Sequence, residues 1–350
     1  MRVSFSFDVE DYITPPEIEL DDLLKMLADV MTEEQVKGTF FLIGEKMRCL
    51  RDRGREDVLK SLRRQDVGSH TSMGSIHPTV TERMEHADWS DGVARMAADE
   101  VAGIREMTEI LGTPVSSLAR HGGSYSPQLV AALGRMGLPY VNSPSRLPGH
   151  NITWYCNALN FYSCLIAFQE SYFTRESFLA KEKQFFALCK ENKNYDWIGI
   201  FHSHPCKIKM TFFGCRNYYD GIYTPPERWL IPDVRDDYTF EGLRKNFALH
   251  CRHLRKDSRF TVMSFKELAK EFGRQAASAD AKEIKALAQK AAEASAPFWT
   301  DRFTASEIVD LLARVYLYRA LKGKLPSSLP RRDAMGPARI PLFPLPPRGV

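Results

Sequence analysis

The first predicted strand of this 350-residue chain ends in three closely spaced acids. Apolar residues alternate with serine over residues 2–7, which is the period of an extended strand, and Asp8, Glu10 and Asp11 follow. Crowded carboxylates repel one another unless water, a cation or a shared proton relieves the repulsion. The cluster is therefore either a solvated strand end or part of a site that binds a cation or moves a proton. Continued alternation would put Asp8 and Glu10 on one side of the chain and Asp11 on the other, which favours Glu10 over Asp11 as a ligand.

A pair of histidines offers the ligands that such a site would need. His70 directly follows a short predicted strand at 66–69, and His77 comes seven residues after it. Two histidines and one carboxylate form a common set for a divalent metal, with positions left open for water and substrate. A single histidine is more often structural, but a pair beyond a strand end, in a chain whose first strand ends in acids, favours ligands.

Two other predicted strands also end in polar side chains. Arg120 follows a predicted strand at 117–119, and His202 follows one at 196–201. In α/β barrels, active sites lie at the carboxyl ends of the strands. We therefore expect these side chains to share one site with the acids of the first strand.

Predicted strands and helices alternate over most of the chain. The strands are expected at 2–11, 38–44, 66–69, 117–119, 140–142, 196–201 and 259–262, and the helices at 21–31, 55–64, 91–111, 126–137, 178–190, 240–254 and 265–272. This alternation predicts parallel strands joined by crossover helices, and so an α/β fold. A segment rich in Tyr, Pro and Gly, from 205 to 238, is predicted to be a long loop.

Composition excludes several classes of protein. Hydrophobic residues make up 44% and charged residues 26%, which is ordinary for a globular protein, and a net charge of +4 gives no argument for nucleic acid. No apolar segment approaches the roughly 20 residues of a membrane span. Acids interrupt what would be the apolar core of a signal peptide, and the seven cysteines form no CxxC pair. A cytoplasmic location with reduced thiols is therefore expected.

The C-terminal part differs from the rest in composition. Residues 275–325 are predicted to form a helical extension, in which Thr304 to Glu307 fits a capping box, and residues 326–350 are rich in proline. We predict a catalytic domain at 1–274, this helical extension and a Pro-rich arm. The extension is a possible contact for a second copy of the chain or for another partner.

The motifs and their order resemble those of the polysaccharide deacetylases, the NodB-homology family of carbohydrate esterases. The resemblance covers about residues 2–272 and rests on these segments: Ser6 to Asp11, Gly38 to Gly44, Gly68 to Thr71 with His77-Pro78, Arg120 to Ser143, and Ile200 to His202. The chain is thereby identified as a divergent, cytoplasmic member. The resemblance implies a distorted (β/α)7-type barrel of the NodB-homology kind, followed by the C-terminal extension.

The family's metal site is carried over onto the matching residues. Glu10, His70 and His77 would hold a divalent ion, with Asp11 as a competitor of Glu10. Zinc is expected first, and cobalt, nickel or manganese are alternatives. The spacing departs from the family, since six residues lie between His70 and His77 where three are usual. The loop must bulge, or a different residue must complete the site.

The resemblance also implies the catalytic roles. Asp8 would be the general base, held ionised by Arg120, and His202 would protonate the leaving amine, with His204 as the substitute candidate. A backbone N–H near Ser124 or Tyr125 would help to stabilise the oxyanion.

Two side chains are added as substrate-binding candidates beside Ser124 and Tyr125. His121 could line the site, and Trp229, in the aromatic loop, could stack on a sugar ring. The arginine motif reads Arg120-His121-Gly122-Gly123 and lacks the family's usual prolines.

Three functions stay open at this point. The first is hydrolysis of an N-acyl group, acetyl above all, on a small or lipid-linked amino sugar or a sugar-containing metabolite. The second is the opening of a cyclic amide, as in allantoinase-like relatives. The third is a sugar-binding or scaffold protein that has lost its metal.

Overall fold

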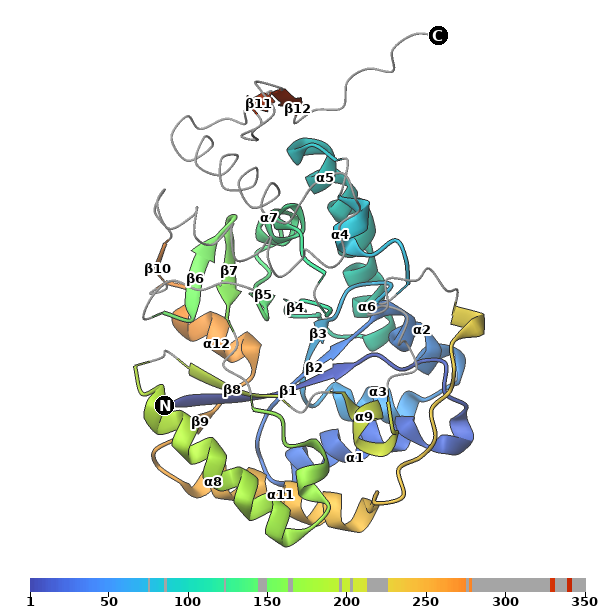
Figure 1. The fold of residues 1–350 in the computed structure, drawn as a ribbon, viewed down its shortest axis with the longest axis vertical. Helices are drawn as coiled ribbons and strands as arrows, with labels where there is room; N and C mark the ends of the chain where they lie inside the picture. The colour runs from blue at the N-terminus through green and yellow to red at the C-terminus, as the bar shows by residue number, and fades with distance from the viewer. Residues whose placement is uncertain are drawn as a thin grey trace.

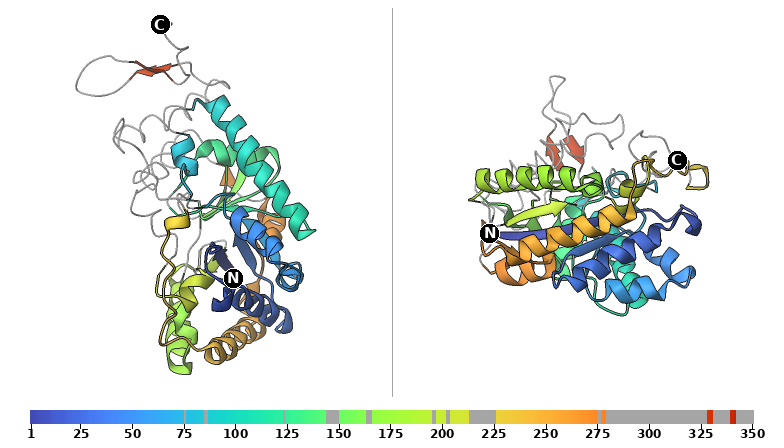
Figure 2. Two further views of the ribbon diagram at one scale, coloured as in Figure 1. Left: turned by 90° about the vertical axis from the view of Figure 1, so that its right-hand side faces the viewer. Right: turned by 90° about the horizontal axis from the view of Figure 1, so that it is seen from below.

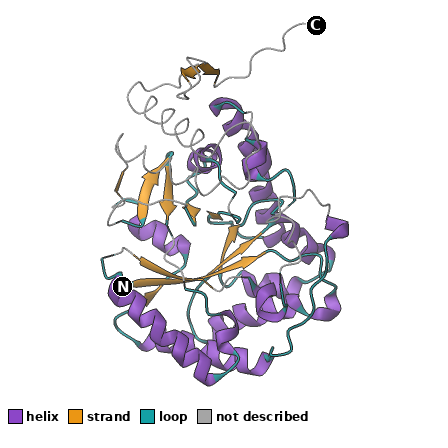
Figure 3. Ribbon diagram, viewed as in Figure 1, coloured by secondary structure: helices purple, strands orange, loops and turns teal. Residues whose placement is uncertain are grey.

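The computed structural model describes residues 1–74, 76–84, 87–122, 124–143, 150–162, 166–194, 197–201, 204–212, 226–274, 277–278, 328–330 and 339–341. A mostly parallel sheet runs through the middle of the molecule, and helices flank it (Figures 1 and 3). The predicted α/β class is confirmed. No helix among the described residues is long and apolar enough to cross a membrane.

The strands of this sheet are β1 (Arg2–Val9), β2 (Thr39–Leu42), β3 (Asp66–Ser69), β4 (Leu118–Ala119), β5 (Tyr140–Val141), β6 (Ile152–Tyr155), β7 (Ala158–Phe161), β8 (Trp197–Phe201), β9 (Thr261–Val262) and β10 (Ala277–Ser278). Within the described residues, seven parallel strands follow one another in the order β8, β1, β2, β3, β4, β5 and β7. This order agrees with the (β/α)7-type arrangement expected from the sequence. Strand β9 pairs with the start of β1, and β6 is antiparallel to β7.

Strand β1 lies between β2 and β8 and is buried on both of its faces. Ser4 and Ser6 are 0% and 2% exposed, so the alternation of serine with apolar residues does not mark a solvated face. Both faces of a parallel sheet are normally covered, which explains the burial. The hydroxyl of Ser4 donates a hydrogen bond of 2.6 Å to the carbonyl of Met263.

The α-helices are α1 (Leu20–Glu33), α2 (Gly44–Asp52), α3 (Glu56–Leu62), α4 (Val80–Arg83), α5 (Trp89–Met96), α6 (Ala102–Leu111), α7 (Pro127–Arg135), α8 (Arg175–Glu191), α9 (Pro205–Lys209), α11 (Phe240–Lys256) and α12 (Phe265–Phe272). Short helical turns are η1 (Pro16–Ile18), η2 (Ala97–Val101, a π-helical turn), η3 (Gln169–Tyr172) and η4 (Pro226–Arg228). Helices α1, α8 and α11 lie together on one side of β1 (Figure 1 and Figure 2). Their apolar side chains and those of β1 form the larger hydrophobic core.

A second, smaller core lies on the other face of the sheet. Successive residues of β2 point to opposite faces, so Phe40 belongs to the larger core and Phe41 to the smaller one. Helix α12 contributes Phe265 and Leu268 to the smaller core. The strand residues of this core are Phe41, Ala119, Val141, Ile152, Leu159 and Phe161. Helix α12 therefore packs inside the curl of the sheet, between its two halves (Figure 1).

Several segments differ from what the sequence predicts. The loop predicted from 205 to 238 begins with a helix, α9, which has Pro205 at its first position. The hairpin of β6 and β7 was not assigned from the sequence, because its turn residues Cys156 and Asn157 carry positive φ angles of 52° and 59° without a glycine.

The helix predicted at 91–111 is also corrected. It is three consecutive segments, α5, η2 and α6, and it begins earlier than predicted, with Asp88 as its N-cap. The Asp88 carboxylate accepts a hydrogen bond of 2.7 Å from the backbone N–H of Asp91. The π-helical turn η2 contains the buried Glu100, whose carboxylate contacts the loop after His70.

Most of the C-terminal region lies outside the described residues, including the predicted capping box at 304–307. Within the Pro-rich arm, β11 (Ser328–Pro330) and β12 (Arg339–Pro341) form an antiparallel pair. Proline is tolerated in such edge strands. The division into a catalytic domain, helical extension and arm remains a proposal.

Candidate metal centre and active site

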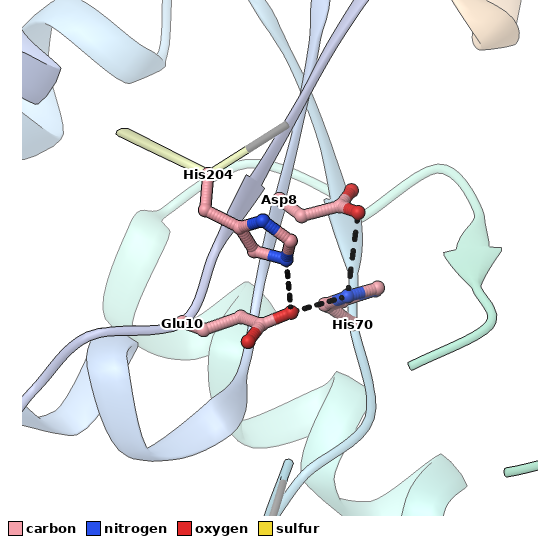
Figure 4. A group of neighbouring side chains, drawn as sticks. All are labelled: Asp8, Glu10, His70 and His204. Carbon is pink, nitrogen blue, oxygen red and sulfur yellow. Dashed lines mark hydrogen bonds and ion pairs between the residues drawn. The ribbon is translucent and has the colours of Figure 1, made fainter. Parts of the chain in front are cut away.

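Four buried side chains meet at the carboxyl ends of the central strands. Asp8 belongs to the end of β1 and Glu10 follows it, His70 follows β3, and His204 precedes α9. One potential ligand atom of each lies within 4.8 Å of those of the other three (Figure 4). Alternation along β1 puts both carboxylates on the same side of the strand, so the chain needs no distortion to bring them together.

The Glu10 carboxylate is the centre of this group. Its Oε1 atom lies 3.0 Å from Nε2 of His70 and 2.8 Å from Nε2 of His204 (Figure 4). His121 joins from the end of β4, with its Nε2 atom 3.3 Å from the same oxygen. The rings of His70 and His121 pack edge to face with centroids 4.9 Å apart. Three imidazoles therefore surround one carboxylate oxygen.

The tautomer of His70 indicates why this arrangement fits a cation. The Nδ1 atom lies 3.2 Å from the carbonyl of Ala119, which can only accept, so Nδ1 carries the proton. Burial lowers the pKa of His70 to about 4, so the ring is neutral at pH 7. Its Nε2 lone pair then faces Glu10 at 3.0 Å and the Oδ2 atom of Asp8 at 3.6 Å. Acceptors that face one another need a proton or a cation between them.

The two carboxylates have opposite electrostatic environments. Burial raises the pKa of Asp8 well above its usual range, Glu10 raises it further, and the charge of Arg120 lowers it. Burial also raises the pKa of Glu10, but the attraction of His204 and His121 outweighs it and holds this pKa well below its usual range. Glu10 is therefore the carboxylate that keeps its charge, and Asp8 is the stronger proton acceptor.

The donor set fits a divalent transition metal. Neutral imidazole nitrogens and carboxylate oxygens are ligands for zinc, cobalt, nickel and iron. The Oδ1 atom of Asp8 is buried and has no hydrogen-bond partner among the described residues. The proton that His70 donates to the Ala119 carbonyl is the outer contact that orients a metal-binding histidine.

The loop after His70 is held from three sides. Thr71 has a φ of 71°, which is unusual for a β-branched residue, and its carbonyl accepts a hydrogen bond of 3.0 Å from Gly44. The N–H of Ser72 donates a hydrogen bond of 2.6 Å to Glu100, which is completely buried. The π-helical turn η2 carries Glu100, whose other oxygen contacts Arg83. Such a conformation persists only where its surroundings fix it.

His77 does not join the four-residue group. Its Nδ1 atom lies 2.8 Å from the Glu82 carboxylate, which also accepts a hydrogen bond of 2.6 Å from the N–H of Thr79. His204 and His121 lie instead beside Glu10. His70 and His77 are thus further apart in the sequence than in the family, and His121 and His204, rather than His77, lie beside the acids.

Asp11 and Arg120 also lie apart from the hydrogen bonds of the group. Asp11 accepts a hydrogen bond of 2.8 Å from Thr14, as the alternation of side chains predicts. Arg120 donates a hydrogen bond of 3.0 Å from Nε to the carbonyl of Asn142. It acts on Asp8 through its charge.

The predicted oxyanion donors are engaged elsewhere. The N–H of Ser124 bonds to the carbonyl of His121 at 3.1 Å, and the N–H of Tyr125 bonds to the hydroxyl of Thr81 at 2.8 Å. The Ser124 hydroxyl also contacts Thr81, at 3.0 Å from its N–H. These contacts indicate a structural role for both residues, and the expectation that either N–H faces a substrate is corrected.

The remaining predicted residues are an aromatic side chain and a histidine. Trp229 is buried. Its ring lies edge to face with that of Tyr12, with centroids 6.1 Å apart, and Tyr12 directly follows Asp11 in the sequence. His202 lies outside the described residues. The sequence did not predict that Glu100 supports the loop after His70. Its only signal was that Glu100 is one of several acids in a long predicted helix.

One family model matches part of the chain. Residues 2–141 match the family model for polysaccharide deacetylase. This part of the chain is therefore similar to a polysaccharide deacetylase domain. The match includes Asp8, Glu10, His70 and His121 but ends before His204, so it covers less of the chain than the predicted resemblance. No curated protein matches the chain.

Three solved structures illustrate the likeness in fold. The 4-alpha-glucanotransferase of Thermococcus litoralis is 10% identical, with a TM-score of 0.50, over 94% of this chain and 61% of that one. The "probable polysaccharide deacetylase" of Pseudomonas aeruginosa PAO1 is 10% identical, with a TM-score of 0.48, over 78% and 91%. A family 4 carbohydrate esterase of Bacillus subtilis is 12% identical, with a TM-score of 0.41, over 77% and 81%.

Proposed function

We propose that the protein is a metal-dependent hydrolase that removes an N-acyl group, acetyl above all, from an amino sugar. The observation that carries this proposal is the buried group of Asp8, Glu10, His70 and His204 at the strand ends. The match of residues 2–141 to the polysaccharide deacetylase model supports the reaction class.

The chain's own residues divide the work as follows. Glu10, His70 and His204 hold the ion, for which zinc, cobalt, nickel and manganese are the candidates. A bound ion would lower the pKa of a water molecule and polarise the acyl carbonyl. Asp8 would accept a proton from the attacking water as general base, and its raised pKa makes it a better acceptor. The positive charge of Arg120 offsets part of the rise in the pKa of Asp8 and so favours its ionised form.

The leaving amine needs a proton donor. We assign this role to His202, because the Nε2 atom of His204, the substitute candidate, points at Glu10 from 2.8 Å. Tyr12, which is partly exposed and packs against Trp229, is the aromatic side chain on which a sugar ring could stack.

The proposed substrates are a small N-acetylated amino sugar, a nucleotide-linked sugar or a lipid-linked sugar. The proposed location is the cytoplasm.

The test measures metal content and amine release together. The purified full-length protein is assayed by elemental analysis and then incubated with N-acetylglucosamine, its nucleotide-linked form and allantoin, with and without chelator. Chelator-sensitive release of amine from a sugar supports the proposal. Ring opening of allantoin without amine release would instead support the cyclic-amide function. A protein without bound divalent ion and with chelator-resistant activity refutes the metal-dependent mechanism.

The role of Asp8 has its own test. Asp8→Asn should lower turnover by about 100-fold or more, as expected for loss of a general base, while the variant still binds metal. Wild-type turnover in the metal-loaded variant would rule out Asp8 as the base.

A further inference from the structure

His121 is a third histidine at the centre of the site, and its neighbours in the sheet place it there. Ala119, two residues earlier, belongs to the small core inside the curl of the sheet, together with Phe41 and Val141. Alternation beyond β4 puts His121 on the same inner side as Ala119. The side chain is 3% exposed, and its ring packs against that of His70.

Hydrogen bonding alone does not account for three imidazoles around one oxygen. The Oε1 atom of Glu10 lies 3.0 Å from Nε2 of His70, 3.3 Å from that of His121 and 2.8 Å from that of His204. A carboxylate oxygen offers about two lone-pair positions, so it cannot accept all three contacts well. In addition, His70 already donates its ring proton to the carbonyl of Ala119.

The same distances fit the edges of a coordination polyhedron. With metal–ligand bonds of ~2.1 Å, neighbouring ligands are ~3.0 Å apart around a six-coordinate ion and ~3.4 Å apart around a tetrahedral one. The three contacts of Glu10, at 2.8, 3.0 and 3.3 Å, scatter around the six-coordinate value. Four protein ligands would close a tetrahedral site, whereas a catalytic site needs an open position.

We propose that His121 is a metal ligand, so that three imidazoles and the Glu10 carboxylate hold a five- or six-coordinate divalent ion. This inference rests on the proposed metal-dependent function. In this arrangement His121 and His204 replace His77, which is paired with Glu82. The Asp8 carboxylate, one of whose oxygens belongs to the four-residue group, is kept in this arrangement as the base and not as a ligand.

The test counts imidazole ligands directly. Full-length protein is stripped with chelator, titrated with cobalt chloride and studied by X-ray absorption and calorimetry. The wild type should show three imidazoles, and His121→Ala and His121→Asn should show two. Their cobalt affinity should fall by at least about 10-fold, since loss of a mere outer contact already costs that much. Circular dichroism identifies which variants are folded, and the Asn variant serves if the Ala variant is not.

Two matched histidine variants serve as controls. His253→Ala removes a partly exposed histidine that pairs with Glu182, and it should keep three imidazoles. His77→Ala should also keep three imidazoles, because His77 contacts Glu82 rather than Glu10.

The outcomes separate this inference from the function on which it rests. An unchanged imidazole count in both His121 variants, or a lower count in His77→Ala, overturns the ligand role of His121 and leaves a metal-dependent enzyme. A wild-type protein that binds no cobalt overturns the proposed function itself.

Discussion

Replacing Asp8 with asparagine should stabilise the metal-stripped protein. Asp8 is 4% exposed, its Oδ1 atom has no hydrogen-bond partner in the described part of the chain, and Glu10 lies beside it. One carboxylate oxygen of Asp8 lies within 4.8 Å of one carboxylate oxygen of Glu10. Without a cation between them, two negative charges repel one another in a buried place. Asparagine has almost the same shape and carries no charge.

The magnitude follows from that separation. At about 4.8 Å and an effective dielectric constant of about 20, two unit charges repel by about 3 kcal/mol. The positive charge of Arg120 offsets part of this repulsion. We therefore expect Asp8→Asn to raise the free energy of unfolding of the metal-free protein by about 2 kcal/mol at pH 7.

The pH dependence has a definite sign. Burial and the charge of Glu10 raise the pKa of Asp8 in the folded state, so the folded protein binds this proton more tightly than the unfolded chain does. The cost of Asp8 therefore begins above its unfolded pKa of about 3.9 and grows until the pH passes the folded value. The advantage of the asparagine variant should grow over the same window and vanish below it.

Urea unfolding of chelator-treated protein between pH 4 and 8 measures this effect, read as a shift of the midpoint at constant slope. The control is Asp52→Asn, which changes an exposed aspartate and should alter stability little. Saturating cobalt should remove or reverse the higher stability of the Asp8→Asn variant. A ligand that binds only the folded state stabilises it, and cobalt should stabilise the wild type more, because asparagine attracts a cation less than aspartate does. A metal-free Asp8→Asn protein less stable than the wild type at pH 7 would refute the repulsion argument.

Three further substitutions test the supports of the site. Asp21 forms an ion pair of 2.5 Å with the buried Lys46. Burial raises the pKa of Asp21, but the attraction of Lys46 is stronger, so the net effect is a lowered pKa. Its stabilisation is therefore present above pH ~3.9 and is lost as the pH falls through the lowered value. Asp21→Asn should cost about 3 kcal/mol at pH 7 in urea unfolding, with a difference from wild type that shrinks in acid. Glu100→Gln should weaken its bond to the Ser72 N–H and lower cobalt affinity about 10-fold by calorimetry. Gly44→Ala would put a Cβ atom 2.6 Å from the Ser72 carbonyl and should cost about 1–3 kcal/mol in thermal or urea unfolding. Unchanged affinity or stability would contradict each expectation in turn.

The sequence predicted most of the regular elements because their signals are local. The first strand, the helix that Ser126 and Pro127 begin, and the helix from Phe265 to Phe272 all lie where alternation, capping or helical periodicity put them. The hairpin at Cys156 and Asn157 was missed, because only the tertiary structure holds these residues at positive φ.

For the acid cluster, the sequence alone determined that Asp8 and Glu10 share a side of their strand. Side-chain alternation is a property of one extended segment, and it also separates Asp11, which bonds to Thr14. The positions of polar residues at strand ends likewise predicted a common site for the acids and His70.

Only the tertiary structure decided which histidines join the acids. The resemblance to the family's metal motif proposed His77, but His77 contacts Glu82 instead, in a loop that Glu100 helps to hold. His121 and His204 come to Glu10 from segments far apart in the chain. Their approach depends on the order of the strands and on how the sheet curls, and neither is a local property of the sequence.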